Sequence, residues 1–109
     1  MVESLHKGRD FSDVYDAKRS RANRHLAMYV RENGRDHNRI GIVASKKLGN
    51  SVVRHRVKRL IKESLRTNGD KFSNGLDIIV IARRECVGKT QAEITNAVLH
   101  VAGLLGITI

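Results

Sequence analysis

The sequence contains no proline and no tryptophan, a single cysteine, and only two Phe and two Tyr among its 109 residues. The lone Cys86 excludes an intramolecular disulfide and a zinc site built on several cysteines. The five histidines are scattered without the spacing of metal ligands, so metal binding through them is not expected. With so few aromatic residues, the core has to be built from Val, Ile, Leu and Ala, and the absence of proline fits short turns.

Long apolar runs are also missing from the sequence. No stretch approaches the roughly 20 apolar residues that a membrane-spanning helix needs, and residues 1–10 lack the apolar core of a signal peptide. We therefore expect a cytoplasmic protein. The length suits one domain, residues 1–109, with a single core that needs no metal or disulfide.

Acidic residues are few relative to basic ones. The chain has 21 Lys or Arg against 11 Asp or Glu, which gives a formal net charge of +10. Such an excess favours a nucleic acid as the partner. An anionic membrane surface is the weaker alternative, because a membrane-binding helix would expose Trp, Phe or Leu opposite its charges.

Most of the positive charge lies in residues 45–66, which contain eight Lys or Arg and one acid, Glu63, for a net charge of +7. Apolar or small residues recur there with the spacing of one buried helix stripe, and Asn50 or Ser51 can cap its first turn. The stripe consists of Val53, Val57, Leu60, Ile61 and Ser64. The opposite arc carries His55, Lys58, Arg59, Lys62 and Arg66. The sequence therefore predicts an amphipathic helix with a cationic outer face.

The cations of this helix repel one another at i, i+4, as in Arg54 with Lys58 and Lys58 with Lys62. Taken alone, such a run usually indicates a solvated basic face. Here it follows a Ser-Lys-Lys-x-Gly-Asn turn, whose backbone amides attract anions together with the N-terminus of the helix. This combination favours a polyanion as the ligand.

The remaining periodicities predict an α/β chain. The expected elements are a helix over 8–17, strands beginning near residues 18, 25 and 39, the basic helix, a strand over 76–82 and a helix over 90–105. The turn at Asn33-Gly34 is a hairpin signal, so two or three antiparallel strands should precede the basic helix. The apolar strand 76–82 should be buried on both faces and should follow a crossover that makes part of the sheet parallel. Residues 1–7 are expected to be frayed.

Three of the four aromatic residues fall where they can be displayed. Phe11 and Tyr15 share the first helix, and Tyr29 alternates with Arg31 on the strand face opposite Leu26, Met28 and Val30. Rings beside cations suit single-stranded nucleic acid, because any base can stack on them. Burial of these rings in the core is the alternative. The acids Asp10, Asp13 and Asp16 are spread around the same helix and are expected to be solvated rather than to bind metal.

Two segments, 45–50 and 53–62, make the sequence resemble the protein subunit of bacterial ribonuclease P. They read SKKLGN and VRHRVKRLIK, and the order of elements agrees along essentially the whole chain. Further matching features are Asp10-Phe11, Ala22-Asn23-Arg24 and the DIIVIAR segment at 77–83. The clear departure is His55, where the family's signature has Asn between two arginines.

The resemblance implies an α/β (α+β) two-layer sandwich in α-β-β-β-α-β-α order, of the ribosomal protein S5 domain 2-like type with a left-handed crossover. It also implies that a catalytic RNA, with magnesium in the RNA-protein holoenzyme, removes the 5′ leader of precursor tRNA. The protein alone would be inactive, without catalytic residues, metal ligands or a cofactor of its own. It would assist by binding both the catalytic RNA and the precursor.

The resemblance also suggests site residues. Those of the basic helix and its approach, expected to bind RNA, are Lys46, Lys47, Asn50, Arg54, His55, Arg56, Lys58, Arg59 and Lys62. The cleft for the single-stranded 5′ leader is expected to contain Phe11, Tyr15 and Tyr29, with Arg31 as the cation beside Tyr29.

Other functions are less well supported by the residues. An independent nuclease would need carboxylates or histidines converging on a metal, and the sequence shows no such pattern and no Ser-His-Asp or Cys-His spacing. A ribosomal or general RNA-binding protein without a catalytic partner explains the charge equally well, and only the motifs and the aromatic residues argue against it. A DNA-binding helix-turn-helix is weaker, because the basic helix follows a strand.

Overall fold

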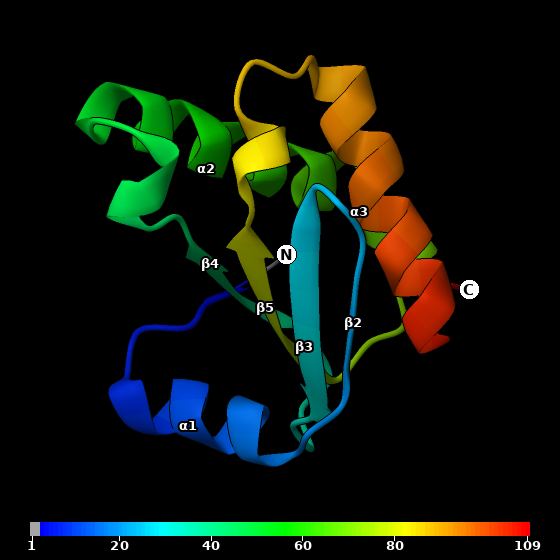
Figure 1. Ribbon diagram of the computed structural model, residues 1–109. Coiled ribbons are helices and arrows are strands. Elements are labelled where there is room, and N and C mark those ends of the chain that lie inside the picture. Colours follow the sequence, from blue (N-terminus) through cyan, green and yellow to red (C-terminus); the bar gives the residue numbers. More distant parts are fainter. Residues whose placement is uncertain (1–2) are drawn as a thin grey trace.

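The computed structural model describes residues 3–109 as a five-stranded sheet with helices on both of its faces (Figure 1). In chain order the elements are β1 (Glu3–Ser4), α1 (Gly8–Asp16), β2 (Ser20–Ala22), β3 (Leu26–Glu32), β4 (Arg39–Val43), α2 (Ser51–Thr67), β5 (Leu76–Ala82) and α3 (Gln91–Leu105). Short 3-10 turns, η1 (Lys46–Leu48), η2 (Gly69–Lys71) and η3 (Arg84–Cys86), lie in the connections. The predicted order of the elements and the α/β class are confirmed.

The start of the chain contains a short strand, β1, where the sequence predicts that residues 1–7 are frayed. Residues 1 and 2 lie outside the described part. Within the described part, β1 pairs in parallel with the first two residues of β4. The amide of Leu5 then donates to the carbonyl of Ile40 at 2.8 Å, and the Leu5 side chain is buried. An apolar contact and a few backbone hydrogen bonds are thus enough to order this short segment.

The strands are arranged in the order β1-β4-β5-β3-β2. β4 is parallel to β5, so the predicted crossover through α2 is confirmed, while β3 is antiparallel to β5. The predicted hairpin at Asn33-Gly34 is wrong, because β5 lies between β3 and β4. β5 is the most apolar strand and is buried on both faces, and only a central position covers it in this way.

The two faces of the sheet are covered differently. One face packs against α2 and α3 through the larger core cluster, and these helices with the sheet form the two main layers. In α2 the buried positions are Val57, Ile61, Ser64 and Leu65, and Asn50 caps the helix by accepting from the Val53 amide at 3.0 Å. The opposite face carries a smaller cluster in which Val14 of α1 packs with Ile79 and Leu5. α1 therefore stands apart from the other two helices (Figure 1).

Candidate nucleic-acid interface

The sheet face beneath α1 is organised in three rows that cross β4, β5 and β3 at matching register. The first row is Arg39, Asp77 and Arg31. The second row is Gly41, Ile79 and Tyr29. The third row is Val43, Ile81 and Ala27. α1 contacts the first two rows, and the side chains of the third row are only partly buried.

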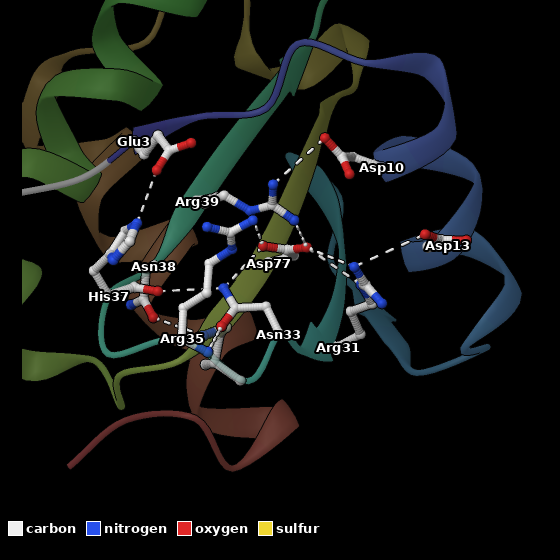
Figure 2. Close-up of polar contacts among 11 residues, drawn as sticks. Glu3, Asp10, Asp13, Arg31, Asn33, Arg35, His37, Asn38, Arg39 and Asp77 are labelled. Atoms are coloured by element: carbon white, nitrogen blue, oxygen red, sulfur yellow. Dashed lines mark hydrogen bonds and ion pairs between the residues drawn. The ribbon is translucent and has the colours of Figure 1, made fainter.

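The first row is a buried ionic cluster centred on Asp77 (Figure 2). Arg39 donates to both of its carboxylate oxygens, through Nε at 2.8 Å and Nη2 at 2.6 Å. Asn33 Nδ2 donates at 2.9 Å and Arg31 Nε at 3.2 Å. Burial by itself would raise the pKa of Asp77, but these hydrogen bonds and the two guanidinium charges outweigh it and lower the pKa. The carboxylate is therefore ionised at neutral pH.

The same two arginines reach from Asp77 to α1. Arg39 Nη1 donates to Asp10 Oδ2 at 3.4 Å, and Arg31 Nη2 lies 3.9 Å from Asp13 Oδ2 (Figure 2). The expectation that these two acids are merely solvated is thus wrong, because the i, i+3 spacing places both toward the sheet. The charge of Arg31 is compensated within the protein by Asp77 and Asp13.

The second row carries the aromatic residues. The rings of Tyr15 and Tyr29 meet edge to face, with centroids 5.0 Å apart and an interplanar angle of 80°. The ring of Phe11 lies directly over the backbone of Gly41. All three rings are partly buried and pack against the small cluster, so they are neither wholly in the core nor free. Burial, followed by the neighbouring Tyr29, raises the pKa of the Tyr15 phenol, which keeps it neutral.

A groove of about 640 Å³ connects the neighbourhood of Phe11 with the outer face of α2. On the sheet side it is lined by Phe11, Leu5 and residues 40–42 of β4. On the helix side its lining includes His55, Lys58, Arg59 and Lys62. Phe11 is the only one of the four predicted cleft residues in this lining. Tyr15, Tyr29 and Arg31 belong to the adjoining sheet face.

The predicted basic face of α2 is exposed. The exposed side chains there are His55, Arg56, Lys58, Arg59, Lys62 and Arg66, and Lys46 and Lys47 are exposed in η1. Arg66 is paired with Glu63, with Nε donating to Oε2 at 3.0 Å, so its charge is partly compensated. Arg54 is only half-buried, although its Nε is buried and finds no hydrogen-bond partner within residues 3–109. The Asn50 side-chain oxygen is occupied by the helix cap.

Three residues of this region have no local sequence pattern that predicts their role. Arg39 and Asp77 carry the ionic cluster, and neither has a local pattern that reveals a partner 38 residues away in sequence. Gly41 lies inside a strand, where a glycine often marks the close approach of another group. That signal was available but is not specific enough to identify Phe11 as the group.

A second group of titratable side chains, one histidine and two carboxylates, lies at the β1 edge of the sheet and does not have the arrangement of a metal site. His37 bridges two carboxylates, with Nδ1 2.9 Å from Asp36 Oδ1 and Nε2 2.8 Å from Glu3 Oε1. The hydrogen bond to Asp36, followed by that to Glu3, raises the pKa of His37. Both ring nitrogens are engaged by these contacts. Across residues 3–109, no cluster of three or more His, Cys, Asp or Glu side chains is arranged to hold a metal ion.

The basic face of α2, joined by the groove to the Phe11 ring on an α/β scaffold, has the features of a small nucleic-acid-binding protein. The family model described as Ribonuclease P matches residues 2–105. The chain belongs to the ribonuclease P protein family, which confirms the resemblance seen in the sequence.

Similar proteins bear this out. The ribonuclease P protein component of Lachnoclostridium phytofermentans is 49% identical over 104 residues, covering 95% of this chain and 90% of that protein. That of Alkaliphilus oremlandii is 48% identical over 99 residues, covering 91% and 87%. The structure of the Staphylococcus aureus RNase P protein matches with a TM-score of 0.88 at 36% identity, covering 97% of both chains. The Thermotoga maritima protein matches with a TM-score of 0.82 at 29% identity, covering 90% and 93%.

Family membership establishes the general function. The chain is a protein subunit of ribonuclease P, an RNA-based endoribonuclease that acts in tRNA 5′ processing. An RNA partner in the holoenzyme follows from this. The alternative of a general RNA-binding protein without a catalytic partner is thereby set aside. As a separate observation, none of the helices described in residues 3–109 has the length and apolarity to cross a bilayer.

Proposed function

We propose that this chain binds two RNAs with adjoining surfaces. The outer face of α2 binds the catalytic RNA. The rings of Phe11, Tyr15 and Tyr29, called the aromatic row below, bind the 5′ leader of precursor tRNA. The observation that carries the proposal is the shared groove, in which Phe11 stands on one wall and Lys58, Arg59 and Lys62 on the other. A single strand lying here would meet a ring for its bases and cations for its phosphates.

The charge of the groove supports this assignment. Its lining includes Lys58, Arg59, Lys62 and Arg66 but no carboxylate among residues 3–109. Two acids of α1, Asp10 and Asp13, are directed at Arg39 and Arg31. Arg66 is partly compensated by Glu63, whereas Lys58, Arg59 and Lys62 have no ion-pair partner among residues 3–109. A phosphate backbone in the groove therefore meets positive charge on α2, and the charges of Asp10 and Asp13 are paired with arginines of the sheet.

The remaining predicted site residues take roles along this path. Lys46 and Lys47 in η1 and Arg56 on α2 extend the cationic surface toward the N-terminus of the helix, where backbone amides also attract phosphate. His55 lines the groove at the position where the family has Asn. Its ring nitrogen can donate or accept one hydrogen bond in place of the amide. Arg31 acts mainly by holding α1 beside the leader path.

We assign the hydrolytic step to the catalytic RNA and the magnesium ions to the RNA-protein holoenzyme. Among residues 3–109 no group of carboxylates and histidines is arranged as a ligand set, and Asp77, Asp10 and Asp13 are paired with arginines. What the protein supplies in this proposal is binding and orientation of the leader relative to the RNA. We also propose that residues 1–109 act as one RNA-binding domain in the cytoplasm.

Replacing Tyr29 by alanine tests the leader site. One stacked base contributes about 1–3 kcal/mol, so holoenzyme affinity for precursor tRNA should fall by roughly five- to a hundredfold. Affinity for mature tRNA, which has no leader, should change little. The measurement is the dissociation constant of each RNA from holoenzyme assembled with wild-type or variant protein.

Tyr29→Phe is the matched control, because it keeps the ring and should retain the preference for precursor tRNA. Equal losses for precursor and mature tRNA in Tyr29→Ala would contradict the leader assignment. A melting temperature recorded for each variant identifies the case in which Tyr29 serves the scaffold alone.

A further inference from the structure

The position of α1 over the sheet is set by two consecutive contacts with one strand. Arg39 and Gly41 are successive residues on the same face of β4, and they contact Asp10 and Phe11, which are adjacent in α1. The ion pair and the ring contact therefore lie side by side. Together they fix both the register of α1 along β4 and the turn of the helix that carries Phe11.

The contact at Gly41 requires a residue without a side chain. A Cβ at this position would lie 2.6 Å from Cζ and 2.8 Å from Cε1 of Phe11. Carbon atoms in contact are separated by about 3.5–4.0 Å, so the ring would have to retreat by about 1 Å. Gly41 is not in the left-handed region of φ, so the requirement concerns space and not backbone conformation.

The ion pair beside it is held from behind. Arg39 is buried, and its Nε and Nη2 donate hydrogen bonds to Asp77. Its Nη1 is left to donate to Asp10. Because Asp77 and Arg39 belong to paired strands, the position of Nη1 is tied to the middle of the sheet. Asp10, and with it the first turn of α1, is located by this fixed donor (Figure 2).

We propose that Gly41 and Arg39 are positioning residues of the leader site: the bare backbone of Gly41 seats the Phe11 ring at the mouth of the groove, and Arg39 fixes the helix turn that carries it. This inference rests on the proposed leader-binding function of the aromatic row. It extends that function to two residues that need not touch RNA. A methyl group at position 41 would push the Phe11 ring into the space that a leader base fills. Such a shift matters because binding sites depend on side chains placed to within about 0.5 Å.

Gly41→Ala separates positioning from folding. The atoms that clash with the new methyl group are at the far end of the Phe11 side chain, which can swing toward the groove. Alanine is also better suited than glycine to a strand interior. The melting temperature should therefore be unchanged or slightly higher, while the preference of the holoenzyme for precursor over mature tRNA should fall by about fivefold or more.

A double-mutant cycle with Phe11→Ala makes the test specific. Phe11→Ala should itself lower the preference for precursor tRNA, and adding Gly41→Ala to it should cause no further loss, because the displaced ring is gone. Asp10→Asn, compared with the exposed Asp16→Asn on the same helix, tests the ion pair in the same assay. Only Asp10→Asn should reduce the preference.

The outcomes distinguish loss of the leader site itself from loss of the positioning role. An unchanged preference in Phe11→Ala and Tyr29→Ala would remove the leader site itself, and the positioning role with it. A normal loss in Phe11→Ala but a wild-type preference in Gly41→Ala would overturn the positioning role alone. An equal loss of preference when Gly41→Ala is introduced into wild type and into Phe11→Ala would also overturn the positioning role. A large fall in the melting temperature of Gly41→Ala would do the same, because either result would show that Gly41 serves only the stability of the fold.

Discussion

Replacing Asp77 by alanine is expected to lower the free energy of unfolding by about 3–5 kcal/mol, the cost of leaving a buried ion without its partner. Asp77 is fully buried, and the Arg39 side chain that it neutralises is only 8% exposed. Without the carboxylate, Arg39 and Arg31 would face each other across β5. Denaturant or thermal unfolding of the isolated protein measures the loss, which should lower the melting temperature by at least about 4 °C per kcal/mol for a domain of this size.

Asp70→Ala is the matched control, because Asp70 is exposed in η2 and should change stability by no more than about 0.5 kcal/mol. Similar losses from the two substitutions would contradict the account of the buried cluster. A small loss for Asp77→Ala alone would do the same, since it would mean that water or another acid replaces the carboxylate.

The Asp77 contribution should also depend on pH in a defined direction. Its pKa in the folded protein lies below the ordinary value of 3.8, because the hydrogen bonds and charges of the arginines outweigh burial. Its stabilising effect is therefore complete above the pKa of the unfolded chain and is lost as pH falls through the folded value. The difference in stability between wild type and Asp77→Ala should be constant from about pH 5 to 7 and should shrink below about pH 4.

The second large effect is expected from the basic helix. Neutralising about six phosphates would give a slope of roughly −4 to −5 for the logarithm of RNA affinity against the logarithm of salt concentration. Replacing Arg59 and Lys62 together by alanine should make this slope shallower by about two and should weaken binding roughly 30-fold at 0.15 M salt. Both side chains are exposed on the helix side of the groove. Titrations of the catalytic RNA at several salt concentrations measure the change.

The matched control for this double variant is Arg21→Ala with Arg24→Ala, which removes the same charge from exposed positions in and beside β2. β2 is at the sheet edge farthest from β1 in the strand order, and it lies outside the groove lining. An unchanged slope for the α2 variant, or the same change in both, would move the RNA-binding surface away from α2.

Local sequence patterns predicted the elements well where one face of the element is buried. The stripe of α2 is confirmed at Val57 and Ile61, and the apolar run 76–82 is the central strand. The helix predicted over 90–105 is α3, whose first turn is capped by a box of Thr90 and Glu93. These predictions succeed because each depends on residues within one or two turns of one another. The alternation around Tyr29 likewise predicted the face on which its ring lies.

The features that the sequence did not predict all depend on strand order. Once β5 separates β3 from β4, Asp77 lies between Arg31 and Arg39 at matching register, and Gly41 comes under Phe11. A direct hairpin between β3 and β4 would have excluded β5, and Asp77 with it, from the space between Arg31 and Arg39. The solvated acids expected on α1 became ion-pair partners for the same reason, because their partners are assembled only by the complete sheet.

The role of the chain as an accessory subunit is measured by a cleavage assay at low magnesium concentration with purified protein, the cognate catalytic RNA and precursor tRNA. We predict that protein and catalytic RNA together cut at the mature 5′ end, that the RNA alone is much slower under these conditions, and that RNA-free protein cuts nothing. Multiple-turnover maturation of precursor tRNA by the RNA-free protein would contradict the account. So would a failure of the protein to restore cleavage by its cognate RNA.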